Sequence, residues 1–136
     1  MNLKNAIFFA LTLAFTSCDK SETAKHAEAL PVTAIIKNGT WVMTYTEGGI
    51  NIDLGTTNAT FSDGGKVVIT KNATTYNGTW KEMKTESVHT LALNINTDDT
   101  ALFRVNGSWK VIIATSTHID ITDPDLNKRH TVHLNK

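Results

Sequence analysis

Histidines and carboxylates are the side chains of this sequence that could ligate a metal ion, and the chain has five histidines. His118 and Asp120 are two residues apart, a spacing that places both side chains on one face of a β-strand. His130 and His133 are three apart and would face opposite sides. A zinc or copper site would therefore need His118, Asp120 and one further histidine. Because solvent-facing polar residues are far more common than such sites, we expect no metal and no cofactor.

The sequence contains no arrangement typical of a nucleophilic enzyme. It has no Gly-x-Ser-x-Gly turn, and its carboxylates are too scattered to nominate an acid–base pair. The single cysteine, Cys18, ends an apolar segment near the N-terminus. We therefore expect a protein that is not an enzyme.

Residues 1–17 have the layout of a secretory signal. Lys4 supplies a positive start, residues 6–15 read AIFFALTLAF without a charge, and small residues precede Cys18. An apolar run of about 7–15 residues followed by small residues is typical of a cleaved signal peptide. The run is too short to span a bilayer, which takes about 20 apolar residues.

The residues Phe15-Thr16-Ser17-Cys18 resemble the lipobox of bacterial lipoproteins. This resemblance implies that residues 1–17 are a lipoprotein signal peptide and that Cys18 becomes the lipid anchor, carrying acyl chains of the palmitate type. Two or more such chains hold a protein stably on a membrane. The alternative is a plain signal peptide with an incidental cysteine. Residues 18–37 have no aromatic side chain, and we expect them to be the lipidated cysteine and a flexible tether.

Composition limits the partners of the exported chain. Lysine and arginine number 13, as do aspartate and glutamate, and cleavage would remove Lys4 only, leaving a formal charge of −1. No basic cluster is present, so the electrostatic footprint of a nucleic-acid-binding protein is missing. We expect one domain, no nucleic-acid partner and a monomer.

Residues 38–136 alternate apolar and polar side chains at the period of a β-strand. The apolar positions are Trp41, Met43, Tyr45, Val67, Ile69, Leu91, Leu93, Ile95, Trp109, Val111, Ile113, Ile119, Ile121, Val132 and Leu134. Turn signals separate these runs at residues 63–65, 72–75 and 123–125. Residues 97–105 interrupt the alternation, and Asp98 or Asp99 could cap a single helical turn there. The pattern predicts an all-β, antiparallel barrel or sandwich with one short helical turn.

A pattern of Asn-Gly-Thr/Ser-Trp occurs three times and ends at Trp41, Trp80 and Trp109. We expect Asn-Gly to form a turn or bulge at each strand start, and each tryptophan to face inward. Three inward indoles either fill the core or line a ligand cavity.

At these residues the chain resembles a known family. Gly39-Thr40-Trp41 is similar to the Gly-x-Trp of the first lipocalin strand, and runs such as ATFSDGGKVVI and ALFRVNGSWKVI resemble the small lipocalin-like lipoproteins of Bacteroidota. The resemblance implies an up-and-down lipocalin-like β-barrel of about eight strands over residues 38–136. It implies the cell envelope, with the outer membrane as the expected location and its periplasmic and cell-surface faces both open. In lipocalins a basic residue packs over the first-strand tryptophan, and Arg129 is the candidate here.

Two functional hypotheses follow, because the fold brings no activity by itself. The first is a binding module for a small hydrophobic or glycan ligand, contacted by Trp41, Tyr45, Trp80, Phe103 and Trp109. The alternative is a solid-core interaction or structural protein that docks an envelope partner or inhibits an enzyme. Tryptophans packed against Phe61, Leu91 and Leu93 would leave no cavity and would favour this alternative.

One further site is a modification. The triplet Asp99-Thr100-Ala101 resembles the O-glycosylation motif of exported proteins in Bacteroidota. It falls in the segment that breaks the strand pattern, where a loop is expected to be exposed. The resemblance implies Thr100 as the acceptor.

Overall fold

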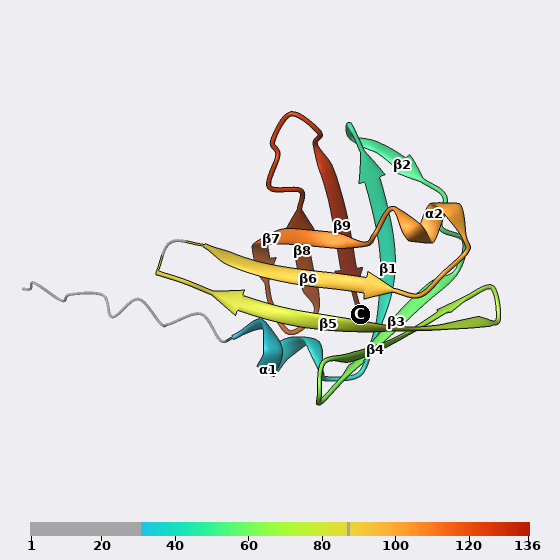
Figure 1. The fold of residues 1–136 in the computed structure, drawn as a ribbon, viewed down its shortest axis with the longest axis horizontal. Coiled ribbons are helices and arrows are strands. Elements are labelled where there is room, and N and C mark those ends of the chain that lie inside the picture. Colours follow the sequence, from blue (N-terminus) through green and yellow to red (C-terminus); the bar gives the residue numbers. More distant parts are fainter. Residues whose placement is uncertain (1–30, 87) are drawn as a thin grey trace, which may run out of the picture.

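Nine strands and two short helices make up residues 31–86 and 88–136, the part of the chain that this computed structural model describes. In chain order they are α1 (Val32–Ile36), β1 (Thr40–Glu47), β2 (Ile50–Ile52), β3 (Thr57–Ser62), β4 (Lys66–Lys71), β5 (Thr74–Lys84), β6 (His89–Ile95), α2 (Thr100–Phe103), β7 (Gly107–Ala114), β8 (His118–Thr122) and β9 (His130–Asn135) (Figure 1).

The described strands close into an antiparallel, up-and-down barrel of eight strands, β1 and β3 to β9. From β3 onward each pairs with the next along the chain, and β1 pairs with both β3 and β9, which closes the barrel. The short β2 pairs with the last three residues of β1, where β3 no longer reaches. The predicted all-β barrel with a short helical turn is thereby confirmed.

The inward side chains form one continuous core. The predicted alternation holds at fourteen of the fifteen apolar positions, since Val111 is partly buried and packs on the core and the other thirteen are buried. Ile113 is the exception, at 42% exposed. A β-bulge causes this, because the register with β8 shifts by one residue between Val111 and Ile113. One additional residue in a strand moves the following side chains to the opposite face.

The predicted turns lie where the turn signals placed them. The turn at residues 63–65 joins β3 to β4, and Asn72 and Ala73 take positive φ between β4 and β5. Residues 123–125 begin the connection between β8 and β9. Asp99 caps α2, because its carboxylate accepts a hydrogen bond from the N–H of Leu102 at 2.8 Å.

The second Asn-Gly-Thr-Trp pattern does not make a turn. Gly39 and Gly107 precede or begin strands with positive φ, as expected, but Gly78 lies inside β5. A Cβ there would come within 2.5 Å of the Asn94 carbonyl oxygen and 2.9 Å of the Ile95 Cα. Glycine is needed at this position because β5 and β6 approach each other closely.

Helix α1 occupies residues that we expected in the tether, so the folded domain begins earlier than residue 38. Val32, Ile35 and Ile36 are buried in the core. The carboxylate of Glu82 accepts hydrogen bonds from the N–H groups of Val32 (3.0 Å) and Thr33 (2.7 Å), and it also contacts the Thr33 hydroxyl. This segment packs because three of its five residues are large and apolar.

The two ends of the barrel differ. One end, which we call the α1 end, carries α1 and the turns at residues 63–65 and 115–117. The opposite end, the α2 end, carries α2, the β1–β2 turn and the β8–β9 loop (Figure 1).

Candidate functional site

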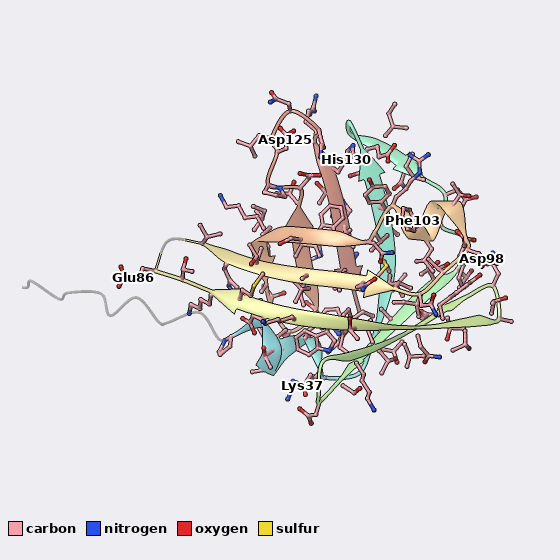
Figure 2. The ribbon with its side chains drawn as sticks, in the orientation of Figure 1. Lys37, Glu86, Asp98, Phe103, Asp125 and His130 are labelled. Atoms are coloured by element: carbon pink, nitrogen blue, oxygen red, sulfur yellow. The ribbon has the colours of Figure 1, made fainter. Side chains whose placement is uncertain are left out.

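Four of the five residues predicted to contact a ligand lie in the barrel core. The exposed fraction is 0% for Trp41, 1% for Tyr45, 7% for Trp80 and 3% for Trp109. Phe103 is 61% exposed and lies on α2 at the surface (Figure 2). The structure therefore brings four of these residues into one core and leaves Phe103 outside it.

Aromatic side chains pack against one another inside the barrel. Tyr45 meets Trp109 edge-on at a centroid distance of 6.2 Å, and Phe61 meets Trp80 in the same way at 5.8 Å. The indole N–H groups at positions 41, 80 and 109 donate to the carbonyls of Ile36 (2.7 Å), Ser62 (3.2 Å) and Val105 (2.9 Å). Three hollows in the described part, of about 450, 350 and 310 Å³, all open at its surface. The core side chains thus act as packing rather than as the lining of an interior cavity.

A basic side chain does cover the first-strand tryptophan, but it is Lys136. Its Nζ lies 4.3 Å from the centroid of the Trp41 ring, a cation–π contact. The candidate Arg129 is wrong, because it lies at the α2 end, beside Gly49. Since β9 runs antiparallel to β1, the residue that follows β9 reaches the start of β1.

The 310 Å³ hollow at the α2 end is the candidate site, and we call it the α2-end hollow. Its lining comes from the α2–β7 segment and from the β8–β9 loop: Arg104, Asn106, Gly107, Ser108, Trp109, Asp123, Pro124, Lys128 and His130. Both segments are connections that the barrel holds in place, as is common for binding sites. The larger 450 Å³ hollow is formed by β5, β6 and the turn at residues 63–65, and it includes Trp80 among its lining residues: Gly64, Gly65, Thr79, Trp80, Lys81, Ala92, Leu93 and Asn94.

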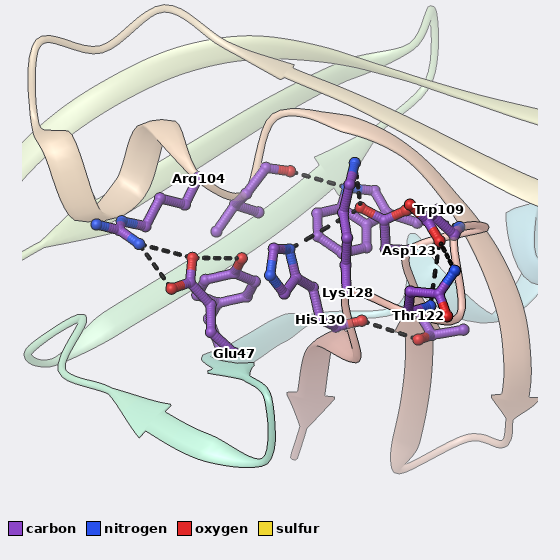
Figure 3. A network of polar contacts seen from close by, with 11 residues as sticks. Glu47, Arg104, Trp109, Thr122, Asp123, Lys128 and His130 are labelled. Carbon is purple, nitrogen blue, oxygen red and sulfur yellow. Dashed lines mark hydrogen bonds and ion pairs between the residues drawn. The ribbon is translucent and has the colours of Figure 1, made fainter.

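Arg104, which lines the α2-end hollow, is also part of an ion pair that is joined to a tyrosine beside the hollow (Figure 3). Arg104 Nη1 donates to both carboxylate oxygens of Glu47, at 2.6 and 2.7 Å, and the Tyr45 hydroxyl donates to one of them at 3.0 Å. The hydrogen bond from Arg104 holds the pKa of Glu47 below its usual range. Burial, then the Glu47 carboxylate, raises the pKa of Tyr45. The tyrosine therefore stays protonated and acts as a donor.

The opposite wall is built around Asp123 (Figure 3). Lys128 Nζ lies 3.5 Å and His130 Nδ1 lies 3.9 Å from one Asp123 oxygen. The Thr122 hydroxyl donates to the His130 carbonyl at 2.8 Å, which fixes the start of the loop. The hollow thus offers nitrogen donors and a carboxylate acceptor on facing segments, the groups that bind a polar ligand.

His133 is the further histidine that lies beside His118 and Asp120 in the structure. His118 Nε2 lies 3.0 Å and His133 Nδ1 lies 2.6 Å from the two oxygens of Asp120. Hydrogen bonds to Asn135 and then to Asp120 raise the pKa of His118. Among the described residues no group of three or more His, Cys, Asp or Glu is arranged to hold a metal ion. The trio is a hydrogen-bonded cluster on the outer face of β8 and β9.

Two sequence-predicted sites remain. Thr100 is exposed at the start of α2, and the neighbouring Asp99 carboxylate is held by Lys71 Nζ at 2.7 Å. Cys18 lies outside the described residues, as does the predicted signal peptide. No helix of the described ranges is long and apolar enough to cross a membrane.

Sequence reasoning missed Glu47, Arg104, Asp123, Lys128 and His130 as site residues. Glu47 and Arg104 are 57 positions apart, so no local spacing links them. Only the closure of the barrel brings the β1–β2 turn, α2 and the β8–β9 loop to one end. The chain matches no family model, no curated protein and no solved structure.

Proposed function

We propose that this chain is a lipoprotein of the bacterial cell envelope, held on the outer membrane by acyl chains on Cys18, with a non-catalytic, lipocalin-like binding domain. The leader and its terminal cysteine support the anchor. The closed up-and-down barrel and the contact of Lys136 with Trp41 support the lipocalin-like class. Exposure of Thr100 supports its proposed O-glycosylation.

The ligand we propose is polar, such as a short glycan, and it binds in the α2-end hollow. The observation that carries this proposal is the lining of the hollow, where Arg104, Lys128 and Asp123 come together. The filled barrel interior leaves little room there for a hydrophobic ligand, and by itself it favours the second candidate below. Sugar hydroxyls both donate and accept hydrogen bonds, and Arg104, Lys128 and Asp123 offer both functions. About 310 Å³ is at the small end of ligand pockets, which favours a ligand of one or two sugar units.

The test uses the acylated mature chain, residues 18–136, in detergent, incubated with neutral and acidic oligosaccharides and observed by native mass spectrometry. We expect adducts that the double variant Arg104→Gln, Lys128→Gln loses. The variant Arg129→Gln is the matched control, since Arg129 lies in the same loop but does not line the hollow. Glycan adducts that persist in the double variant, or lipid adducts alone, would refute binding in this hollow.

The anchor has its own test, the incorporation of labelled palmitate during growth. We expect the wild-type chain to carry the label and to sediment with outer membranes. The variant Cys18→Ser should lose both properties. Equal labelling of the two chains would contradict the anchor.

Docking of an envelope protein is a second candidate, and it rests on exposed apolar side chains around the same end. Ile50, Phe103 and Leu126 are 71%, 61% and 74% exposed, the largest values among the described large hydrophobic residues. They come from the β1–β2 turn, α2 and the β8–β9 loop. The test is photo-crosslinking on cells. A photo-crosslinking residue in place of Phe103 should capture one envelope protein reproducibly, and the same residue in place of Val68, the control, should not.

A further inference from the structure

The outer face of strands β4 to β7 carries lysines without acidic partners. Lys66, Lys81 and Lys110 are exposed, and none of their ammonium groups has an ion-pair partner in the described part of the chain. The only carboxylate within these four strands belongs to Glu82, and it is turned toward α1. This face is therefore positively charged, although the mature chain is not.

Exposed apolar side chains lie on the same face near the α1 end. Met83 pairs with Thr90, which pairs with Lys110, so the three side chains lie in one row across β5, β6 and β7. Met83 and Ile112 are 42% and 54% exposed. The bulge in β7 exposes two consecutive isoleucines, since Ile113 is also directed outward. Bulges often redirect side chains toward functional surfaces.

The position of this face relative to the chain's N-terminus suggests what covers it. The described chain enters the barrel through α1, and Glu82 of β5 holds the start of that helix. The 13 residues between Cys18 and Val32 span at most about 45 Å even when fully extended. A domain anchored through Cys18 therefore stays close to the bilayer.

We propose that this surface, the basic–apolar face (Lys66, Lys81, Met83, Lys110 and Ile112), docks on the bilayer that holds the anchor; the inference rests on the proposed acylation of Cys18. The ammonium groups contact anionic lipid headgroups, and Met83 and Ile112 enter the interfacial region. Clustered lysines and exposed apolar side chains together are the combination that binds an anionic membrane surface. The hollow of about 450 Å³ lies on this face, with Lys81 on its border, and gives a headgroup room beside that lysine.

Site-directed spin labelling tests this docking in the acylated mature chain, residues 18–136, reconstituted in vesicles of phosphatidylethanolamine and phosphatidylglycerol. Because Cys18 is the only native cysteine and is acylated, Ile112→Cys introduces the only free thiol. Leu126→Cys, at the α2 end, is the control on an apolar residue that is more exposed still, at 74%. Collisions of the nitroxide with oxygen and with a water-soluble nickel complex report its depth.

We expect the label at position 112 to be shielded from the nickel complex and accessible to oxygen, and the label at position 126 to behave as in water. Adding Lys81→Glu and Lys110→Glu should return the label at 112 to water. Water-like behaviour at 112 in the acylated chain, or burial at 126, would overturn the docking but leave the anchor intact. If the wild-type chain has a free Cys18 thiol and is not retained on vesicles, the anchor is overturned, and this inference is overturned with it.

Discussion

At the scale of single residues, the aromatic type of a side chain does not decide whether it lies in the core or at the surface. Trp80 and Phe103 are both large, aromatic and predicted to contact a ligand, yet one is 7% and the other 61% exposed. Trp80 lies at an inward position of β5, because successive side chains of a strand point to opposite faces, and its side chain packs in the core. Phe103 ends a helix of four residues whose single buried position is taken by Leu102.

Replacing these two aromatics should therefore have unequal effects. Trp80→Ala leaves a cavity beside Phe61 and should lower the free energy of unfolding by about 3–5 kcal/mol. Phe103→Ala should change it by less than about 0.5 kcal/mol. Urea denaturation followed by far-ultraviolet circular dichroism measures both. Equal losses would contradict the assignment of Trp80 to the core and Phe103 to the surface.

Glu82 is the residue that fastens α1 to the barrel. Its side chain is 10% exposed, and His89 Nε2 contacts the same carboxylate that accepts from Val32 and Thr33. Burial alone would raise the pKa of this carboxyl. The hydrogen bonds from Thr33, His89 and Val32 outweigh burial and hold the pKa below its usual 4.5. Its stabilising effect is therefore complete above pH 4.5 and is lost as the pH falls through the lowered pKa.

The variant Glu82→Gln should lower the free energy of unfolding at neutral pH by about 1.5–3 kcal/mol, because it replaces a charged acceptor by a neutral one. The difference from wild type should shrink as the pH falls below 4.5, where the wild-type carboxylate becomes protonated. Denaturant titrations at neutral and acidic pH measure this difference. Glu86→Gln, in the exposed turn that follows β5, is the control and should be nearly neutral. A difference that does not change with pH would contradict this account.

At the scale of elements, the pairing of β5 with β6 depends on a glycine. The eleven residues of β5 pair with β4 in their first half and with β6 in their second. Gly78 belongs to both pairings, opposite Val67 on one side and Ile95 on the other. The backbone of β6 comes so close to Gly78 that any Cβ would force the two strands apart.

Gly78→Ala should consequently destabilise the protein, by about 1–3 kcal/mol, as an overpacked site does. Amide hydrogen exchange should speed up in β5 and β6 before it does in β8 and β9. The neighbouring Thr79→Ala, on the exposed face, should have little effect. A Gly78→Ala variant as stable as wild type would show that the strands separate at no cost.

At the scale of the whole molecule, closure between β1 and β9 makes one core and two unlike ends. Six carboxylates lie at or near the α2 end: Glu47, Asp53, Asp98, Asp99, Asp123 and Asp125. Three of them pair with cations there, since Glu47 meets Arg104, Asp99 meets Lys71 and Asp123 meets Lys128. The α2 end therefore carries paired charges, whereas the three lysines of the basic–apolar face have no ion-pair partner among the described residues.

A single core predicts a single unfolding transition. Because the buried apolar side chains of the described ranges belong to one cluster, the barrel and α1 should unfold together. Tryptophan fluorescence and far-ultraviolet circular dichroism should give coincident curves in urea. Two separated transitions would show that α1 or the β5–β6 hairpin melts independently.

The sequence alone determined the fold class. Alternation at period two and strong turn signals are local properties, so they placed six of the nine strands, the turns at residues 63–65 and 72–75, and a helical turn capped by Asp98 or Asp99, of which the structure selects Asp99. The three tryptophans were assigned to the inner face for the same reason. Local pattern failed at Ile113 and at Gly78, where a bulge and a close strand approach depend on the neighbouring strand.

Tertiary structure decided what lies together at the ends of the barrel. The α2-end hollow joins Arg104 to Asp123, Glu47 pairs with Arg104, and Lys136 covers Trp41, because closure places distant segments side by side. It also decided that the interior is filled, since the sequence allowed the tryptophans either to pack or to line a cavity. Side-chain type and alternation fix which face a residue takes, whereas only the closed register of all eight strands fixes which residues meet.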